Sequence, residues 1–85
     1  MGNEAAQGGS QLMRLSEADI GSTVSVVAVH GTGPVSKRLM EMGLVPGVPV
    51  RLVKTAPFGD PIEISLRGYN LALRSTEAAT VEVRA

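Results

Sequence analysis

The chain has 85 residues, eight basic and eight acidic side chains that cancel, and no cysteine. A chain of this length has room for one small domain, and without cysteine its stability must come from packing rather than from disulfides or zinc-thiolate sites. The balanced charge leaves no basic footprint for a phosphate backbone, so we expect no nucleic-acid partner. No apolar run approaches the ~20 residues that span a bilayer, and no export signal is recognisable, so we expect a cytoplasmic protein.

The first twelve residues, MGNEAAQGGSQL, are small and polar with no apolar periodicity. They predict a disordered N-terminal extension over 1–12 and a single domain over 13–85. Residues 15–20 predict one helical turn, with Ser16 as the N-cap and Gly21 as the stop. The β-branched run TVSVVAV predicts a first strand over 23–29.

A short helix is predicted from Pro34, because the first helical position tolerates the missing N–H of proline. Its apolar residues Val35, Leu39 and Met42 recur at helical spacing and predict one buried stripe, and Gly43 is expected to cap the helix in a left-handed conformation. The polar side chains are expected on the wetter side of the helix: Ser36, Lys37 and Glu41.

Short segments of alternating apolar and polar residues follow the turn at Val45 to Gly47. They predict strands that begin near Val48, Ile62, Tyr69 and Val81, with a helical turn over 75–79 before the last one. Pro49 is expected at an edge or a bulge. So many short strands can bury their inner faces only in a small barrel, so the fold class is mainly β: a five-stranded, SH3-like barrel with one short α-helix between the first and second strands.

Residues with catalytic potential are few, and we predict no catalytic residues and no metal ligands. His30 is the single histidine, and no nucleophile motif surrounds any serine. We interpret His30 as a partly exposed residue at a strand end, with a metal ligand or pH sensor as the alternative. Glu63 and Glu82 are expected to face solvent. Four arginines on different strands (Arg51, Arg67, Arg74, Arg84) are interpreted as solubilising charge, with a basic stripe as the alternative.

The segment MEMGLVPG, residues 40–47, together with Leu39 before it, carries more apolar surface than one narrow helix stripe can bury. Some of it is therefore expected to be exposed, and Met40 lies off the predicted stripe. Methionine is flexible and polarizable, which suits adaptable protein contacts. The alternative is that all of these apolar side chains complete the core.

Three ordered motifs resemble the ferrous iron transport protein A (FeoA) family. The first is the helix end and turn, Arg38 to Gly47; the second is the loop APFGDP, residues 56–61; the third is LALR, residues 71–74, followed by Glu77, Ala78 and a last strand. The resemblance covers roughly residues 13–84. It implies an SH3-like barrel without catalytic activity that assists the ferrous iron permease FeoB, through the permease's cytoplasmic GTP-binding part.

With this resemblance, the helix end becomes a candidate docking patch, and the membrane is expected to be reached only through the partner. Met40 and Leu44 are expected to face that partner, with Phe58 and Asp60 as rim contacts. The full set of candidate partner-binding residues is Leu39, Met40, Met42, Leu44, Phe58 and Asp60. No cofactor is expected. The alternative, since transition-metal binding is associated with the family, is an Fe²⁺ chaperone or sensor that uses His30 and a nearby carboxylate; a small hydrolase dependent on His30 is a third hypothesis. The oligomeric state stays open.

Overall fold

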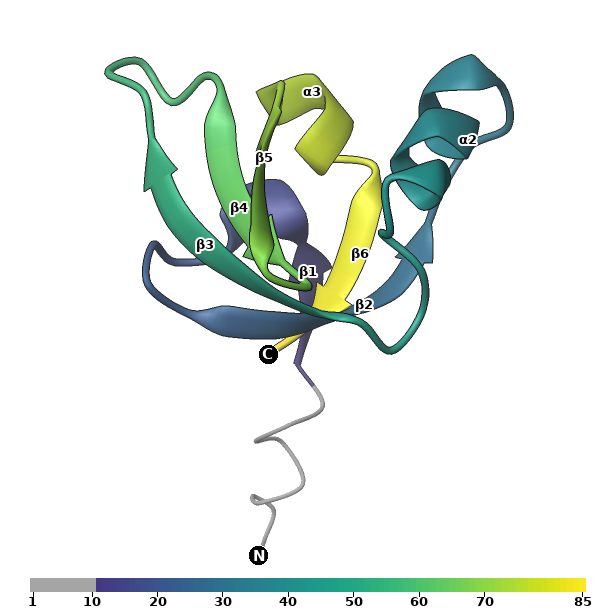
Figure 1. Ribbon diagram of the computed structural model, residues 1–85, viewed down its shortest axis with the longest axis horizontal. Helices are drawn as coiled ribbons and strands as arrows, with labels where there is room; N and C mark the ends of the chain where they lie inside the picture. The colour runs from purple at the N-terminus through teal and green to yellow at the C-terminus, as the bar shows by residue number, and fades with distance from the viewer. Residues whose placement is uncertain (1–10) are drawn as a thin grey trace, which may run out of the picture.

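A computed structural model describes residues 11–85, which form one antiparallel sheet curled into a small barrel with three short helical segments (Figure 1). The strand order in the sheet is β1-β6-β2-β3-β4-β5. The strands are β1 (Leu12–Arg14), β2 (Thr23–Val29), β3 (Pro49–Thr55), β4 (Ile62–Leu66), β5 (Tyr69–Leu73) and β6 (Val81–Arg84). The helical segments are the 3-10 turn η2 (Leu15–Glu17) and the α-helices α2 (Pro34–Glu41) and α3 (Ser75–Ala78). The mainly β class with a helix between successive long strands is confirmed.

The described part of the chain has six strands rather than the five predicted, because β1 was not predicted. β1 pairs with β6, with Leu12 opposite Arg84 and Arg14 opposite Glu82. Residues 1–10 of the expected N-terminal extension lie outside the described residues, whereas Leu12 already belongs to the sheet. The barrel therefore begins before Met13.

The core of the barrel is aliphatic, as expected for a chain with so few aromatic residues. Alternate residues of β3 and β4 point inward, so that Val50, Leu52, Ile62, Ile64 and Leu66 are buried while their neighbours are not. Pro49 is the first residue of β3 and pairs with Ser25 of β2, a position where its missing N–H removes no bond inside a ladder. The period-two pattern therefore predicted these inward faces correctly.

The buried face of α2 differs from the predicted stripe. Ser36 and Leu39 are the buried residues of the helix, and Val35 is exposed. The hydroxyl of Ser36 donates a hydrogen bond to the carbonyl oxygen of Gly31 at 3.1 Å, which satisfies the polar group in its buried position. The N-terminal helical turn is also shifted: η2 starts after Arg14, whose backbone N–H donates to Glu17 Oε1 at 2.9 Å, and Ser16 does not cap it.

The C-terminus of α2 ends in a Schellman motif, as Gly43 predicted. Gly43 has φ of +110°, its N–H donates to the carbonyl of Met40 at 3.0 Å, and the N–H of Leu44 donates to the carbonyl of Leu39 at 3.1 Å. This pair of bonds reverses the chain and returns Leu44 to the core. A Cβ at Gly43 would meet Leu66 Cδ1 at 3.0 Å, so the turn is also closely packed.

We expect the Gly43→Ala substitution to destabilise the fold by about 1–3 kcal/mol, because a side chain at this φ is strained and would press on Leu66. Urea unfolding followed by circular dichroism measures the loss. Gly47→Ala is the matched control, since Gly47 has φ of +92° but open space around its Cβ position. An equal loss for both variants would show that the close contact with Leu66 contributes nothing.

Candidate functional site

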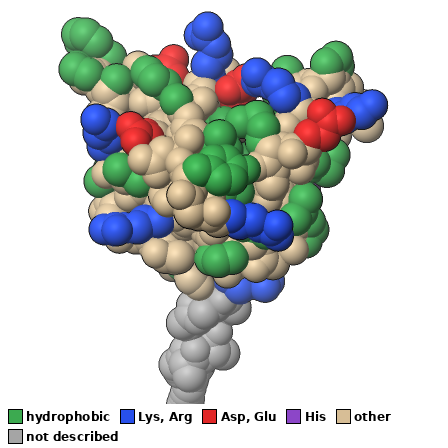
Figure 2. Space-filling view, viewed as in Figure 1, with side chains coloured by type: hydrophobic (Ala, Val, Ile, Leu, Met, Phe, Trp, Pro, Cys, Tyr) green, Lys and Arg blue, Asp and Glu red, His purple; other side chains and the backbone are tan. Residues whose placement is uncertain are grey.

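Hydrophobic side chains gather in the middle of the face that carries α2, α3 and β5, and charged side chains surround them (Figure 2). Three large exposed hydrophobic residues come from these elements: Val35 in the first turn of α2, 46% exposed, Met40 in its last turn, 42% exposed, and Tyr69 at the start of β5, 47% exposed. Met42, the C-cap of α2, is partly buried against the core. We call Met40, Met42 and Tyr69 the α2–β5 patch.

The patch is held in place by a hydrogen bond between elements distant in the sequence. The Tyr69 hydroxyl donates to the backbone carbonyl of Met42 at 2.7 Å. The bond satisfies a carbonyl at the helix C-terminus, which has no partner within the helix. It also fixes the aromatic ring of Tyr69 beside the helix end, so the patch is preformed in the free protein.

Two of the residues predicted to bind a partner are unavailable for contact. Leu39 and Leu44 are both completely buried in the core. For Leu39 this agrees with its place in the predicted buried stripe, but the expectation that Leu44 faces a partner is wrong. The reason is the reversal of the chain at Gly43, which turns Leu44 inward beneath the helix. Met40 remains as the exposed apolar residue of this segment.

Phe58 and Asp60 lie in the loop between β3 and β4, at the opposite side of the molecule from α2 in Figure 1. Phe58 is fully exposed at the tip. The loop is closed by bonds from Ala56 N–H to the carbonyl of Pro61 at 3.0 Å and from Gly59 N–H to the carbonyl of Ala56 at 2.8 Å. The structure therefore does not bring Phe58 next to Met40.

Asp60 has a structural partner of its own. Its Oδ1 accepts a hydrogen bond from the backbone N–H of Ser75 at 2.8 Å, at the start of α3. The carboxylate satisfies a helix donor that has no intrahelical acceptor, and it ties the loop to the helix. Asp60 therefore positions the loop that presents Phe58.

His30 at the end of β2 contacts Glu82 of β6, with 2.8 Å between Nε2 and Oε1. The contact places a carboxylate beside His30, as the alternative hypothesis of an Fe²⁺ site at His30 requires. Within residues 11–85, no group of three or more histidine, aspartate or glutamate side chains lies close enough to hold a metal ion. The pair alone supplies two of the three or four protein ligands typical of a transition-metal site.

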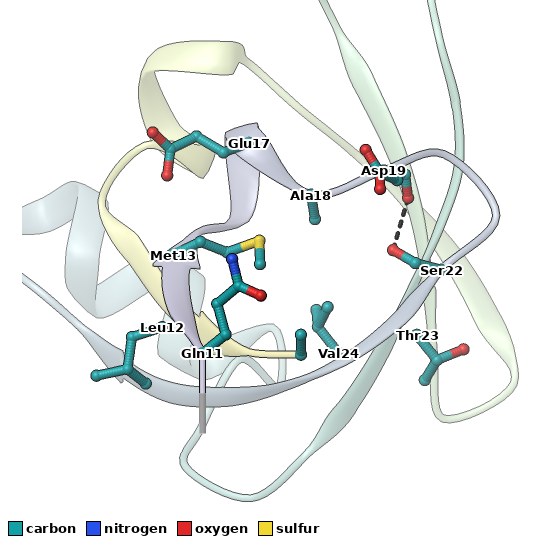
Figure 3. A pocket seen from close by; sticks show the side chains of 10 residues that line it. Gln11, Leu12, Met13, Glu17, Ala18, Asp19, Ser22, Thr23 and Val24 are labelled. Atoms are coloured by element: carbon teal, nitrogen blue, oxygen red, sulfur yellow. Dashed lines mark hydrogen bonds between the residues drawn. The ribbon is translucent and has the colours of Figure 1, made fainter. Parts of the chain in front are cut away.

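The hollow drawn in Figure 3 lies between β1, η2 and the start of β2, a region that sequence reasoning missed because β1 was not predicted. Its volume is about 520 Å³. Glu17 already accepts the backbone N–H of Arg14, and the Ser22 hydroxyl donates to the carbonyl of Asp19 at 2.6 Å. The Ser22 hydroxyl thus bonds to a backbone carbonyl rather than to a carboxylate or to His30, so the hollow gives no support to the hydrolase hypothesis.

None of the helices in residues 11–85 combines the length and the apolar character needed to cross a membrane. Within this range, then, the clearest surface feature is the apolar patch beside α2 on a small antiparallel barrel. These properties define a small SH3-like barrel domain.

The chain belongs to the FeoA family: the FeoA domain profile matches residues 13–85. Over 71 residues, 84% of this chain, it is 42% identical to the Fe(2+) transport protein A/Fe(2+) transporter FeoB fusion protein of Porphyromonas gingivalis. The chain spans 8% of the length of that relative. The resemblance predicted from the three sequence motifs is confirmed.

Solved structures of the family have the same fold. The FeoA-like protein of Clostridium acetobutylicum superposes with a TM-score of 0.80 at 38% identity, covering 87% of this chain and 86% of that one. The zinc complex of Stenotrophomonas maltophilia FeoA, an SH3 domain protein, gives a TM-score of 0.75 at 35% identity, covering 84% and 88%. The SH3-like class and the link of the family to ferrous iron transport are thereby shown.

We expect Leu44→Ala to cost about 2–5 kcal/mol of folding free energy, because it opens a cavity in the core. Met40→Ala should stay within about 0.5 kcal/mol of the parent, because half-exposed side chains contribute little. Parallel urea titrations of the two variants measure the difference. Similar losses at both positions would contradict the burial described for this turn.

Proposed function

We propose that this chain is a non-enzymatic accessory module of ferrous iron uptake that works in the cytoplasm by binding the GTP-binding part of a FeoB permease and modulating Fe²⁺ transport. The observation that supports it most is the fusion of a related FeoA sequence to a FeoB transporter in one polypeptide. Fusion keeps two modules at high local concentration, which suits partners that act together.

The α2–β5 patch is the proposed contact surface. Met40 offers a flexible apolar side chain, and Tyr69 offers a ring whose hydroxyl is already satisfied by Met42. Aromatic and methionine side chains are enriched in the cores of protein interfaces. Phe58, exposed on the loop between β3 and β4, is a second proposed contact, separate from the α2–β5 patch.

Met40→Asp should weaken binding to the purified GTP-binding domain of the permease by about tenfold or more, because a charge would have to be desolvated in the contact. Isothermal titration with and without guanine nucleotide measures the affinity. Ile20→Asp is the matched control: Ile20 is a comparably exposed apolar residue on the connection between η2 and β2. Equal affinities for the Met40 variant and the parent, with native circular dichroism, would remove the patch from the interface.

A second candidate function is Fe²⁺ binding at the His30–Glu82 pair, which the 2.8 Å contact favours. The Stenotrophomonas maltophilia relative was solved with zinc, so a metal role has some support within the family. Both side chains of the pair retain solvent exposure, with His30 the more open. An ion could reach them, but water would have to complete its coordination.

We expect anaerobic calorimetry with Fe²⁺ to give a Kd no tighter than about 1 mM, because two exposed ligands cannot desolvate and hold the ion. Binding in the micromolar range that is abolished in the His30→Ala variant would instead establish the metal-binding function. The Glu82→Gln variant removes the carboxylate ligand but keeps a side chain that can hydrogen-bond to His30. It therefore tests the carboxylate as a ligand separately from its contact with the histidine.

A further inference from the structure

Among the strands of residues 11–85, β5 forms one end of the sheet and pairs only with β4. The hairpin between them turns through Arg67 and Gly68, with φ of +49° and +88°, the signature of a two-residue type I′ turn. Such a turn is closed by a hydrogen-bonded pair, here Leu66 and Tyr69, and bonded pairs then alternate along the strands. The N–H and C=O groups of Asn70 and Ala72 therefore point away from β4.

This free edge lacks the usual protection of an edge strand. Natural sheets blunt their edges with charged side chains, proline or very short strands. β5 reads Tyr-Asn-Leu-Ala-Leu and contains none of these, whereas β1, at the other end of the sheet, has only three residues. Both Asn70 and Ala72 are exposed. The edge thus offers two unpaired donor and acceptor pairs to solvent.

Positive charge flanks the free edge at both ends. Arg67 lies in the turn before β5 and Arg74 directly follows the strand. Within residues 11–85, neither forms an ion pair with a carboxylate. Three carboxylates lie beside the edge, and each has a hydrogen-bond partner of its own. Glu77 pairs with Arg38 and accepts the N–H of Arg74, Glu63 accepts the Asn70 side-chain amide at 3.0 Å, and Asp60 accepts the backbone N–H of Ser75.

We propose that the free edge of β5 binds an extended, acidic segment of the permease's cytoplasmic part as an additional strand. The proposal rests on the proposed function and names the kind of segment that the partner contributes. A strand opposite Tyr69–Leu73 has about five residues and spans roughly 17 Å. Carboxylates at its two ends meet Arg67 and Arg74, and backbone bonds to Asn70 and Ala72 fix its register.

A second copy of this chain fits the edge less well. In an antiparallel pairing of two β5 strands that joins Asn70 to Ala72 in both directions, Arg74 of one copy lies opposite Gly68 of the other, next to Arg67. The same contact recurs at the other end of the pair. Like charges facing across strands are destabilising, so the arginines disfavour self-pairing and favour an acidic partner.

The test uses titration of the full chain with the purified cytoplasmic domain of the permease. Ala72→Pro removes an edge donor without touching the ladder to β4, and it should weaken binding by about tenfold. Ala72→Val is the matched control, because it changes the side chain and keeps the N–H. Arg67→Asn with Arg74→Gln should weaken binding and reduce its dependence on salt. Hydrogen exchange should show the Asn70 and Ala72 amides protected in the complex.

The outcomes separate the two proposals. If the parent binds while the Ala72→Pro variant binds equally and the two amides stay unprotected, the edge proposal is overturned and the proposed function stands. If the parent does not bind in either nucleotide state, both are overturned. If Ala72→Pro only converts a dimer of this chain to a monomer in sedimentation velocity, the occupant is a second copy and the edge proposal is wrong.

Discussion

The reversal of the chain at the end of α2 is the constraint on which the rest of the molecule depends. Gly43 takes φ of +110°, which frees the N–H of Leu44 to bond the carbonyl of Leu39 and carries Leu44 into the core. The same reversal leaves the carbonyl of Met42 pointing out, where the Tyr69 hydroxyl reaches it. One turn therefore closes the barrel beneath the helix and builds the apolar patch above it.

Much of the fold could be predicted from the sequence because alternation persists in the longer strands. β2 has the predicted bounds, β4 begins at the predicted Ile62, and Gly43 marks the helix end. β1 has only three residues, too few to show a period, and its strand conformation comes from pairing with β6. The prediction of which face of α2 is buried was wrong for a different reason. Ser36 can be buried because its hydroxyl donates a hydrogen bond to the carbonyl of Gly31, and hydrophobicity alone does not predict that bond.

The candidate site was predictable in its composition but not in its geometry. The apolar surplus around Met40 was read correctly as partly exposed, while Leu44 was assigned to the wrong side because the direction after the turn depends on two backbone bonds. The contact of His30 with Glu82 joins residues 52 positions apart. It follows from the register of β2 against β6, which shifts between Val26 and Ala28, and no local pattern encodes such a shift.

The side-chain patch and the strand edge are parts of one surface, because Tyr69 belongs to both. Its ring stands beside the helix end, and its backbone begins the strand whose next residue, Asn70, opens the free edge. Apolar side chains such as Met40 adapt to many shapes and give little directional selectivity. Backbone hydrogen bonds accept any sequence but demand an extended segment in one register. In the proposed complex, combining the two, with arginines at both ends of the edge, would select an extended acidic segment next to an apolar contact. In that complex, the selectivity would let the barrel recognise one partner.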